Sequence, residues 1–235
     1  MRKIIILTFV ILAFGCKSKI STNNERINVL FIGNSLTYYH DMPKTLQAML
    51  NETDSNFHIE QSTYAGMKLN GHLTDMIVEK SGDTLETRTK EIGEITETEK
   101  KLTSKKWNVI ILQEGTNSQY FPNVVKEVIS PTIVKIKQLV SNKDCKYIMF
   151  NTWPSKGTYP REKKCLPKYY FYPDMIMYAE ESKNEKTCCD RIMNLEEDIK
   201  ILNESYNSIK EENKLVISNH CTKHYQMRIK FPEIE

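Results

Sequence analysis

The sequence predicts an α/β fold, a three-layer α/β/α architecture built on a doubly wound parallel sheet. Residues 29–32 and 107–112 are largely apolar runs without the polar alternation of a half-exposed strand. We therefore expect both in the centre of a sheet that is covered on its two faces. Segments with helical spacing separate the strand-like runs in the order β-α-β-α-β-α-β-α-β, and this alternation favours parallel strands joined by helical crossovers.

The first 16 residues have the pattern of an export signal. Arg2 and Lys3 precede an apolar run, residues 4–14, that is too short to cross a bilayer as a helix. The run ends at Ala13-Phe14-Gly15-Cys16, which resembles a bacterial lipoprotein signal, although Phe14 stands where a small or aliphatic residue is usual. We expect cleavage before Cys16 and lipid attachment to its sulfur; an ordinary secretory signal cut nearby is the alternative.

The remaining sequence predicts a tether and one domain. Residues 17–26 are polar and typical of a tether, and residues 27–235 have the length of a single α/β domain. We therefore expect an exported protein, lipid-anchored in the bacterial cell envelope on its periplasmic or cell-surface side.

The charge balance argues against a nucleic-acid partner. The 33 Lys and Arg residues nearly balance the 30 Asp and Glu residues, and no dense basic patch carries interleaved aromatics. The lone match Cys221-x-x-His224 is too little for a zinc site. We expect neither a metal nor an organic cofactor.

The cysteines fit an oxidising compartment. If Cys16 carries lipid, five cysteines remain, and an odd number cannot all pair within the chain. Cys145 precedes an apolar run and is expected to be a buried thiol. Cys165 and either Cys188 or Cys189 flank an irregular segment, where a disulfide is plausible.

A helix and a second strand are expected after the first strand. Residues 43–51 carry apolar side chains at helical spacing, and Pro43 suits a first helical turn. Residues 57–62 alternate between apolar and polar side chains, which predicts a strand with His58 facing outward.

Residues 71–106 are expected to be mostly helical. Residues 71–79 can place their apolar side chains on one helical face, with His72 on the surface. Residues 83–106 are highly charged with few apolar anchors, and we predict an exposed, largely helical connection there.

The second half continues the alternation. Residues 124–140 predict a helix that Pro131 kinks or restarts, and residues 146–150 predict a fourth strand. Residues 191–213 and 214–218 predict the last helix and the last strand.

Residues 155–190 break the pattern, because they are rich in Pro, Tyr and Lys. An insertion of this length is often a lid or a binding loop. Its aromatic side chains could stack on a sugar or an acyl chain, or they could pack the insertion onto the body.

Ser35 is the candidate nucleophile. It follows the first predicted strand in Gly33-Asn34-Ser35, and ligands of open α/β sheets bind at the carboxyl ends of the strands. Such a tripeptide is also ordinary turn chemistry, in which Asn or Ser caps a helix. Gly66 follows the second predicted strand, either as a turn glycine or as a backbone N–H that can approach a substrate closely.

Residues 27–235 resemble the SGNH/GDSL-type serine hydrolases, in a bacterial branch of unknown function. The block Gly33-Asn34-Ser35-Leu36 matches the one that carries the family's nucleophile, and Gly66 matches a family donor of an oxyanion N–H. The block Gln113-Glu114-Gly115-Thr116-Asn117 matches the third, although Ser118 replaces the usual Asp. The resemblance implies a flavodoxin-like topology and an oxyanion hole formed by Ser35, Gly66 and the amide of Gln113 or Asn117.

The family's fourth block, Asp-x-x-His, does not occur in this sequence. In the family it supplies the general base and its acidic partner near the carboxyl terminus. We expect either that the chain is incomplete at its C-terminus or that His220 or His224 is a substitute base.

The resemblance implies ester hydrolysis, with Ser35 attacking the carbonyl carbon. A small ester or an acylated glycan of the cell envelope is the expected substrate. The alternative is a non-catalytic surface lipoprotein that binds a carbohydrate or a protein on the same scaffold. A flavodoxin-type protein is disfavoured by the export signal and by the lack of a Gly-rich loop after the first strand.

Overall fold

A five-stranded parallel sheet forms the centre of the domain. The computed structural model describes residues 25–53, 55–115, 118–119, 121–152, 164–166, 191–193 and 195–218. The strand order is β2-β1-β5-β6-β9, and every neighbouring pair is parallel, which confirms the predicted fold class. The strands are β1 (Ile27–Gly33), β2 (Phe57–Thr63), β5 (Val109–Leu112), β6 (Lys146–Met149) and β9 (Val216–Ile217).

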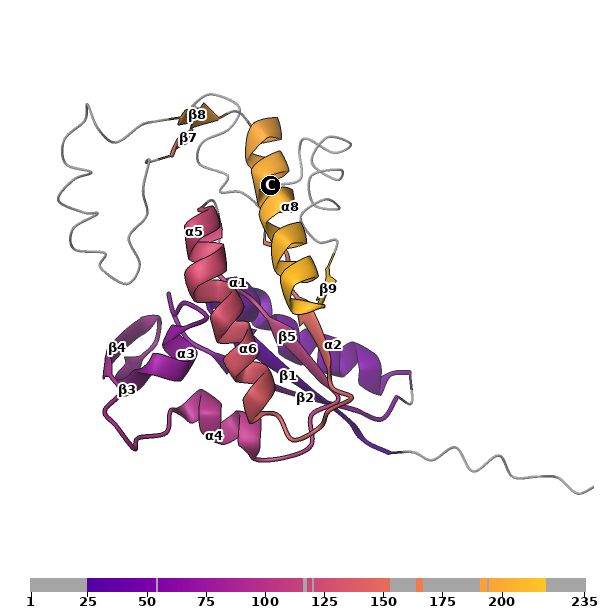
Figure 1. Cartoon of the computed structure of the whole chain (residues 1–235). Coiled ribbons are helices and arrows are strands. Elements are labelled where there is room, and N and C mark those ends of the chain that lie inside the picture. Colours follow the sequence, from indigo (N-terminus) through magenta and orange to yellow (C-terminus); the bar gives the residue numbers. More distant parts are fainter. Residues whose placement is uncertain are drawn as a thin grey trace, which may run out of the picture.

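Helices cover both faces of the sheet. They are α1 (Ser35–Tyr38), α2 (Met42–Asn51), α3 (Gly71–Thr74), α4 (Glu97–Thr103), α5 (Pro122–Val124), α6 (Ser130–Leu139) and α8 (Leu195–Asn213), with a 3-10 turn at Tyr39–Asp41 and a π-helical turn at Val125–Ile129. In Figure 1, α4, α6 and α8 lie over one face of the sheet and α2 lies over the other. The chain passes from β1 to β2 in one direction and through β5, β6 and β9 in the other, so the topological switch point lies between β1 and β5.

The main core lies between the sheet and the layer of α4, α6 and α8. Leu30 and Ile32 of β1 and Ile110 and Leu112 of β5 are fully buried there. The helices contribute Leu102, Ile133, Ile136, Leu202 and Ile209. Because apolar burial is the main favourable term in folding, this packing fixes the ends of β1 and β5 relative to each other.

The predicted helix over residues 71–79 is wrong beyond its first turn. α3 ends at Thr74, and the chain continues as strand β3 (Asp75–Ser81), which pairs antiparallel with β4 (Thr84–Thr89). The two residues Gly82-Asp83 join them, and Gly82 has a φ of 54°, a positive value that tight hairpin turns require. The apolar side chains that suggested a helix are too few to outweigh pairing between these two strands.

The predicted helical connection over residues 83–106 is also only partly right. Its first part is β4, and its α-helix is the short α4. The start of α4 is fixed by a capping box: Thr96 Oγ1 accepts from the Glu99 amide at 3.1 Å, and the Thr96 amide donates to the Glu99 carboxylate at 2.7 Å.

Several boundaries near the other elements differ by a few residues. Helical residues run without a break from Pro122 to Leu139, and Pro131 follows the π-helical turn, so the helix is distorted just before Pro131 and does not restart there. The last helix begins at Leu195, since Arg191–Met193 is strand β8 and pairs with β7 (Lys164–Leu166). The rest of the predicted insertion, including the possible disulfide partners of Cys165, lies outside the described residues.

Cys145 is a buried free thiol, as predicted, and is 8% exposed. Burial raises the pKa of this thiol to about 11, which keeps it protonated and unreactive at neutral pH.

Candidate active site

Ser35 lies at the carboxyl edge of the sheet, directly beside the switch point. It is the first residue of α1 and follows β1 with only Asn34 between them. Its side chain is half-buried. Within the described part of the chain, nothing hydrogen-bonds to the Ser35 hydroxyl or accepts from its backbone amide. Both groups are therefore available to a substrate that reaches this edge.

The turn that carries Ser35 is held by Asn34. The Asn34 side chain accepts from the Leu36 amide at 3.1 Å and so caps α1, while its Nδ2 donates to the Met67 carbonyl at 3.2 Å. Asn34 is 5% exposed. The capping function that turn chemistry predicts is thus performed by Asn34, and this leaves the Ser35 hydroxyl outside the cap.

Gln113 fixes the same turn from the end of β5. Its Oε1 accepts from the Asn34 amide at 2.8 Å and from Thr37 Oγ1 at 2.9 Å, and its Nε2 donates to the Glu114 carbonyl at 2.6 Å. The Gln113 side chain passes so close to Gly33 that a Cβ on Gly33 would lie 2.5 Å from Oε1. A glycine is required there because only a residue without a side chain leaves room for this amide.

Gly66 lies in a tight turn after β2. The Met67 amide donates to the Tyr64 carbonyl at 3.2 Å, and Gly66 has a φ of 63°, which disfavours any other residue. Gly66 is exposed, and among the residues that the structure describes none accepts a hydrogen bond from its amide. Gly66 is therefore a turn glycine that needs a positive φ, and its N–H is unpaired among the described residues.

A buried carboxylate, Glu114, lies beneath these loops. Its Oε2 accepts from the Leu69 amide at 2.8 Å and its Oε1 accepts from the Gly115 amide at 2.8 Å. Burial raises the pKa of this carboxyl, whereas the Lys68 ammonium and the hydrogen bonds oppose that rise. Burial lowers the pKa of Lys68, whose Nζ donates to Ser118 Oγ at 2.7 Å.

His72 is buried, and the prediction of a surface position is wrong. It is 1% exposed, with Nε2 at 3.0 Å from the Gly33 carbonyl and Nδ1 at 2.8 Å from Thr98 Oγ1. A carbonyl can only accept, so Nε2 carries the proton and Nδ1 accepts from Thr98. Burial lowers the pKa of His72 to about 4, and the ring is neutral at pH 7.

Neither of the two histidines whose side chains are described is a candidate general base for Ser35. Both nitrogens of His72 are used within the fold, and His58 is half-buried on β2, where its Nε2 lies 3.0 Å from Glu60 Oε1. Of the other predicted site residues, Cys16, Asn117, His220 and His224 lie outside the described residues.

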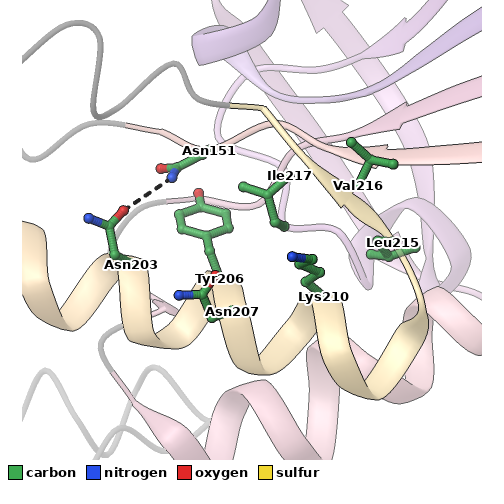
Figure 2. Close-up of a pocket in the computed structure, with 8 residues that line it drawn as sticks. All are labelled: Asn151, Asn203, Tyr206, Asn207, Lys210, Leu215, Val216 and Ile217. Atoms are coloured by element: carbon green, nitrogen blue, oxygen red, sulfur yellow. Dashed lines mark hydrogen bonds between the residues drawn. The ribbon is translucent and has the colours of Figure 1, made fainter.

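A polar groove lies elsewhere on the molecule, between α8 and the edge strand β9. It has a volume of about 410 Å³ and is lined by Asn151, Asn203, Tyr206, Asn207, Lys210, Leu215, Val216 and Ile217. Figure 2 shows the side chains of Asn151 and Asn203 facing each other, with Nδ2 of Asn151 donating to Oδ1 of Asn203 at 3.4 Å. Asn151 is 3% exposed, and its Oδ1 has no hydrogen-bond partner.

The described residues contain neither a membrane-spanning helix nor a cluster of metal-ligating side chains. No helix in the described ranges is long and apolar enough to cross a membrane. Within the same ranges, no group of three or more His, Cys, Asp and Glu side chains could hold a metal ion.

Solved structures show which fold this is. A candidate SGNH hydrolase from Slackia heliotrinireducens has a TM-score of 0.53 at 13% identity, covering 86% of this chain and 83% of that chain. A DUF4886 family protein from Bacteroides uniformis has a TM-score of 0.51 at 16% identity, covering 82% of this chain and 66% of that chain. The periplasmic domain of a lipopolysaccharide acetyltransferase from Salmonella ser. Paratyphi A has a TM-score of 0.42, a similarity too weak to inform fold or function.

The chain has an SGNH-hydrolase-like fold. Identities this low establish the fold alone, since one fold can host many functions. No protein-family model matches the chain, and no curated protein matches its sequence.

Proposed function

We propose that the protein is a serine esterase in which Ser35 is the nucleophile. One observation carries this proposal. The Ser35 hydroxyl, the Ser35 amide and the Gly66 amide are all unpaired within the described chain, at the sheet edge where ligands of this architecture bind. Besides a general base, acyl transfer requires a nucleophile and donors to the oxyanion, and Ser35 and Gly66 would provide these at this edge.

The proposed reaction proceeds in two steps. Ser35 Oγ attacks the ester carbonyl, its proton passes to a general base, and the amides of Ser35 and Gly66 donate to the oxyanion. The base returns the proton to the departing alcohol, and water then releases the acyl group by the same route. The base is His220 or His224, or a histidine of an Asp-x-x-His block that follows Glu235 in a longer protein. The side-chain amide of Asn117 is the third donor in this proposal, because Gln113 already holds the Ser35 turn.

Hydrolysis of 4-nitrophenyl acetate tests the proposal. We would compare the chain with Ser35→Ala and with Ser141→Ala, a matched control because Ser141 is exposed and precedes β6 at the opposite edge of the sheet. Ser35→Ala should lower kcat by about 10³-fold or more, whereas Ser141→Ala should leave it unchanged. The same assay on the protein extended through the downstream reading frame locates the base. Turnover that survives Ser35→Ala in both versions would refute the proposal.

The proposed setting is the bacterial cell envelope, with lipid on Cys16 and an acylated glycan as substrate. The support is the lipoprotein-like signal and the polar tether in the sequence. If Cys16 is the anchor, Cys16→Ser should move the protein from the membrane fraction to the soluble fraction, while Cys145→Ser should not.

A second candidate function is carbohydrate binding in the groove between α8 and β9. The observation that favours it is the amide-rich lining of the groove, where Asn151, Asn203 and Asn207 lie beside Lys210, and where the buried Oδ1 of Asn151 has no partner among the described residues. Its volume suits a small ligand. Under this candidate, Asn203→Ala should weaken retention on a glycan column and Ser35→Ala should not. Retention that is weakened by Ser35→Ala and unchanged in Asn203→Ala would exclude the groove as the binding site.

A further inference from the structure

We propose that Glu114 is a positioning residue that ties together the two loops of the oxyanion hole, with Lys68 as the cation that balances its buried charge. The inference rests on the proposed function, because it assigns a role within the Ser35 site. It adds a residue pair that the resemblance does not supply.

The carboxylate of Glu114 spans two loops. Oε2 accepts from the amide of Leu69, three residues after Gly66, and Oε1 accepts from the amide of Gly115, which opens the loop that leads to Asn117. Each loop carries one proposed oxyanion donor. A single buried side chain therefore joins the backbone at Leu69 to the backbone at Gly115.

The charge state follows from these partners. Both oxygens accept hydrogen bonds from backbone N–H groups, and these bonds, together with the nearby Lys68 ammonium, favour the ionised form and oppose burial, which raises the pKa of Glu114. Glu114 is 2% exposed, and an ionised group at this depth needs a compensating charge. Lys68 supplies it, and Ser118 hydrogen-bonds to both side chains.

The position of Lys68 links this pair to the nucleophile turn. A Cβ built on Gly115 would lie 3.3 Å from Lys68 Nζ and 3.7 Å from Asn34 Nδ2. The ammonium group of Lys68 and the side-chain amide of Asn34, the residue before Ser35, therefore both lie close to Gly115. Asn34 also donates to Met67, so the residues that follow Gly66 are held at Met67 by Asn34 and at Leu69 by Glu114.

The consequence for catalysis is a shift of the Gly66 amide when the carboxylate is removed. Gln at position 114 would keep the shape of the side chain but present an NH₂ group to one of the two amides, which breaks one hydrogen bond and removes the negative charge beside Lys68. A displacement of about 1 Å in a catalytic group can cost about 100-fold in rate.

The test compares Glu114→Gln with Glu60→Gln in ester hydrolysis. Glu60 is a matched control, because it lies on β2 as a half-buried carboxylate and pairs with Lys105. Glu114→Gln should lower kcat by about 10- to 100-fold with less than about a threefold change in KM. If Glu114 had only a structural role, its substitution would lower the melting temperature and leave kcat unchanged, and that result would overturn the inference.

Lys68→Met supplies an independent readout. The groups that face Glu114 are the Lys68 ammonium, the Ser118 hydroxyl and the amides of Leu69 and Gly115. Without Lys68 the pKa of Glu114 rises further, so Glu114 becomes protonated at a higher pH. The acidic limb of the kcat profile should therefore move to higher pH in Lys68→Met. An unmoved limb would count against the pairing.

Amide hydrogen exchange separates this inference from the proposed function. Glu114→Gln should accelerate exchange at Leu69, whereas Glu60→Gln should not, and this readout does not require turnover. If the unmodified protein shows no Ser35-dependent hydrolysis, the proposed function fails while exchange still reports whether Glu114 holds the loop. Unchanged exchange at Leu69 overturns the inference in either case.

Discussion

Buried polar groups are hydrogen-bonded to different extents at two places along the carboxyl edge of the sheet, beside β1 and β5 and beside α8. At the β1–β5 end, Asn34, Gln113, Glu114 and His72 have hydrogen-bond partners that join separate loops. At the α8 end, three buried atoms of described residues have no partner: Gln119 Oε1, Asn151 Oδ1 and Ser205 Oγ. Tyr206 is the exception there, since its hydroxyl accepts from Gln119 Nε2 at 2.6 Å and from the Thr152 amide at 2.9 Å.

The difference indicates what each end can do. An unpaired buried polar atom costs about 1–3 kcal/mol, so a fold keeps few of them without a use. A completed network holds catalytic groups in place before the substrate arrives, which suits the Ser35 turn. Of the three residues with unpaired atoms, only Asn151 lines the groove, and because its Oδ1 is buried, water or a hydroxyl-rich ligand would reach it only after the side chain turns.

The largest effect expected at the Ser35 end is a pH dependence that comes from His72. The unfolded chain binds a proton with a pKa of 6.5, whereas the folded ring does so at about 4. Stability is therefore fully present above pH 6.5 and is lost as pH falls toward 4, by about 3 kcal/mol. Urea unfolding should show this loss between pH 7 and pH 4 for the unmodified protein. His72→Gln keeps a donor for the Gly33 carbonyl and should remove that part of the loss; identical pH profiles would contradict the assignment.

A steric test of the turn should have the next largest effect. Gly33→Ala places a Cβ 2.5 Å from both Gln113 Oε1 and Thr37 Oγ1, so Gln113 must leave the turn. We expect a loss of about 1–3 kcal/mol in unfolding free energy and a large fall in ester turnover. Gly115→Ala is the matched control, because its nearest neighbour is the end of a lysine side chain at 3.3 Å, which can move. Equal effects of the two variants would show that the turn is not tightly packed.

A pair of hydroxyl deletions sharpens the comparison between the two ends. Thr37→Val removes a buried donor to Gln113 and should destabilise the protein by about 1–2 kcal/mol. Ser205→Ala removes an unpaired hydroxyl within α8 and favours the helix, so it should stabilise by about 0.5–1 kcal/mol. Thermal unfolding decides the signs. Two changes of the same sign would remove the distinction between a satisfied and an unsatisfied end.

The fold and the place of Ser35 could be predicted from the sequence because they depend on local patterns. The apolar run of residues 29–32 forms β1, the run ending at Leu112 forms β5, and Ser35 follows β1 as expected. Their parallel pairing brings Gln113 to the turn of Ser35, which the order of strands and helices already implied.

The supporting residues of the site could not be predicted in the same way. His72 is buried by Thr98 and Gly33, which lie 26 and 39 residues away in the chain. Lys68 and Glu114 are charged residues, and charged residues are rarely buried unless paired, so the sequence alone favours the surface for both. The one signal for Glu114 was its place two residues after a buried strand, within a block already assigned to the site.

Covalent labelling of Ser35 tests the central claim most directly. Purified protein would be treated with a fluorophosphonate, digested, and mapped by mass spectrometry, with Ser35→Ala and Ser141→Ala beside it. The account predicts one adduct on the peptide that carries Ser35, present in Ser141→Ala and absent from Ser35→Ala. No adduct on Ser35, or equal labelling of other serines, would contradict the claim that this turn holds an activated nucleophile.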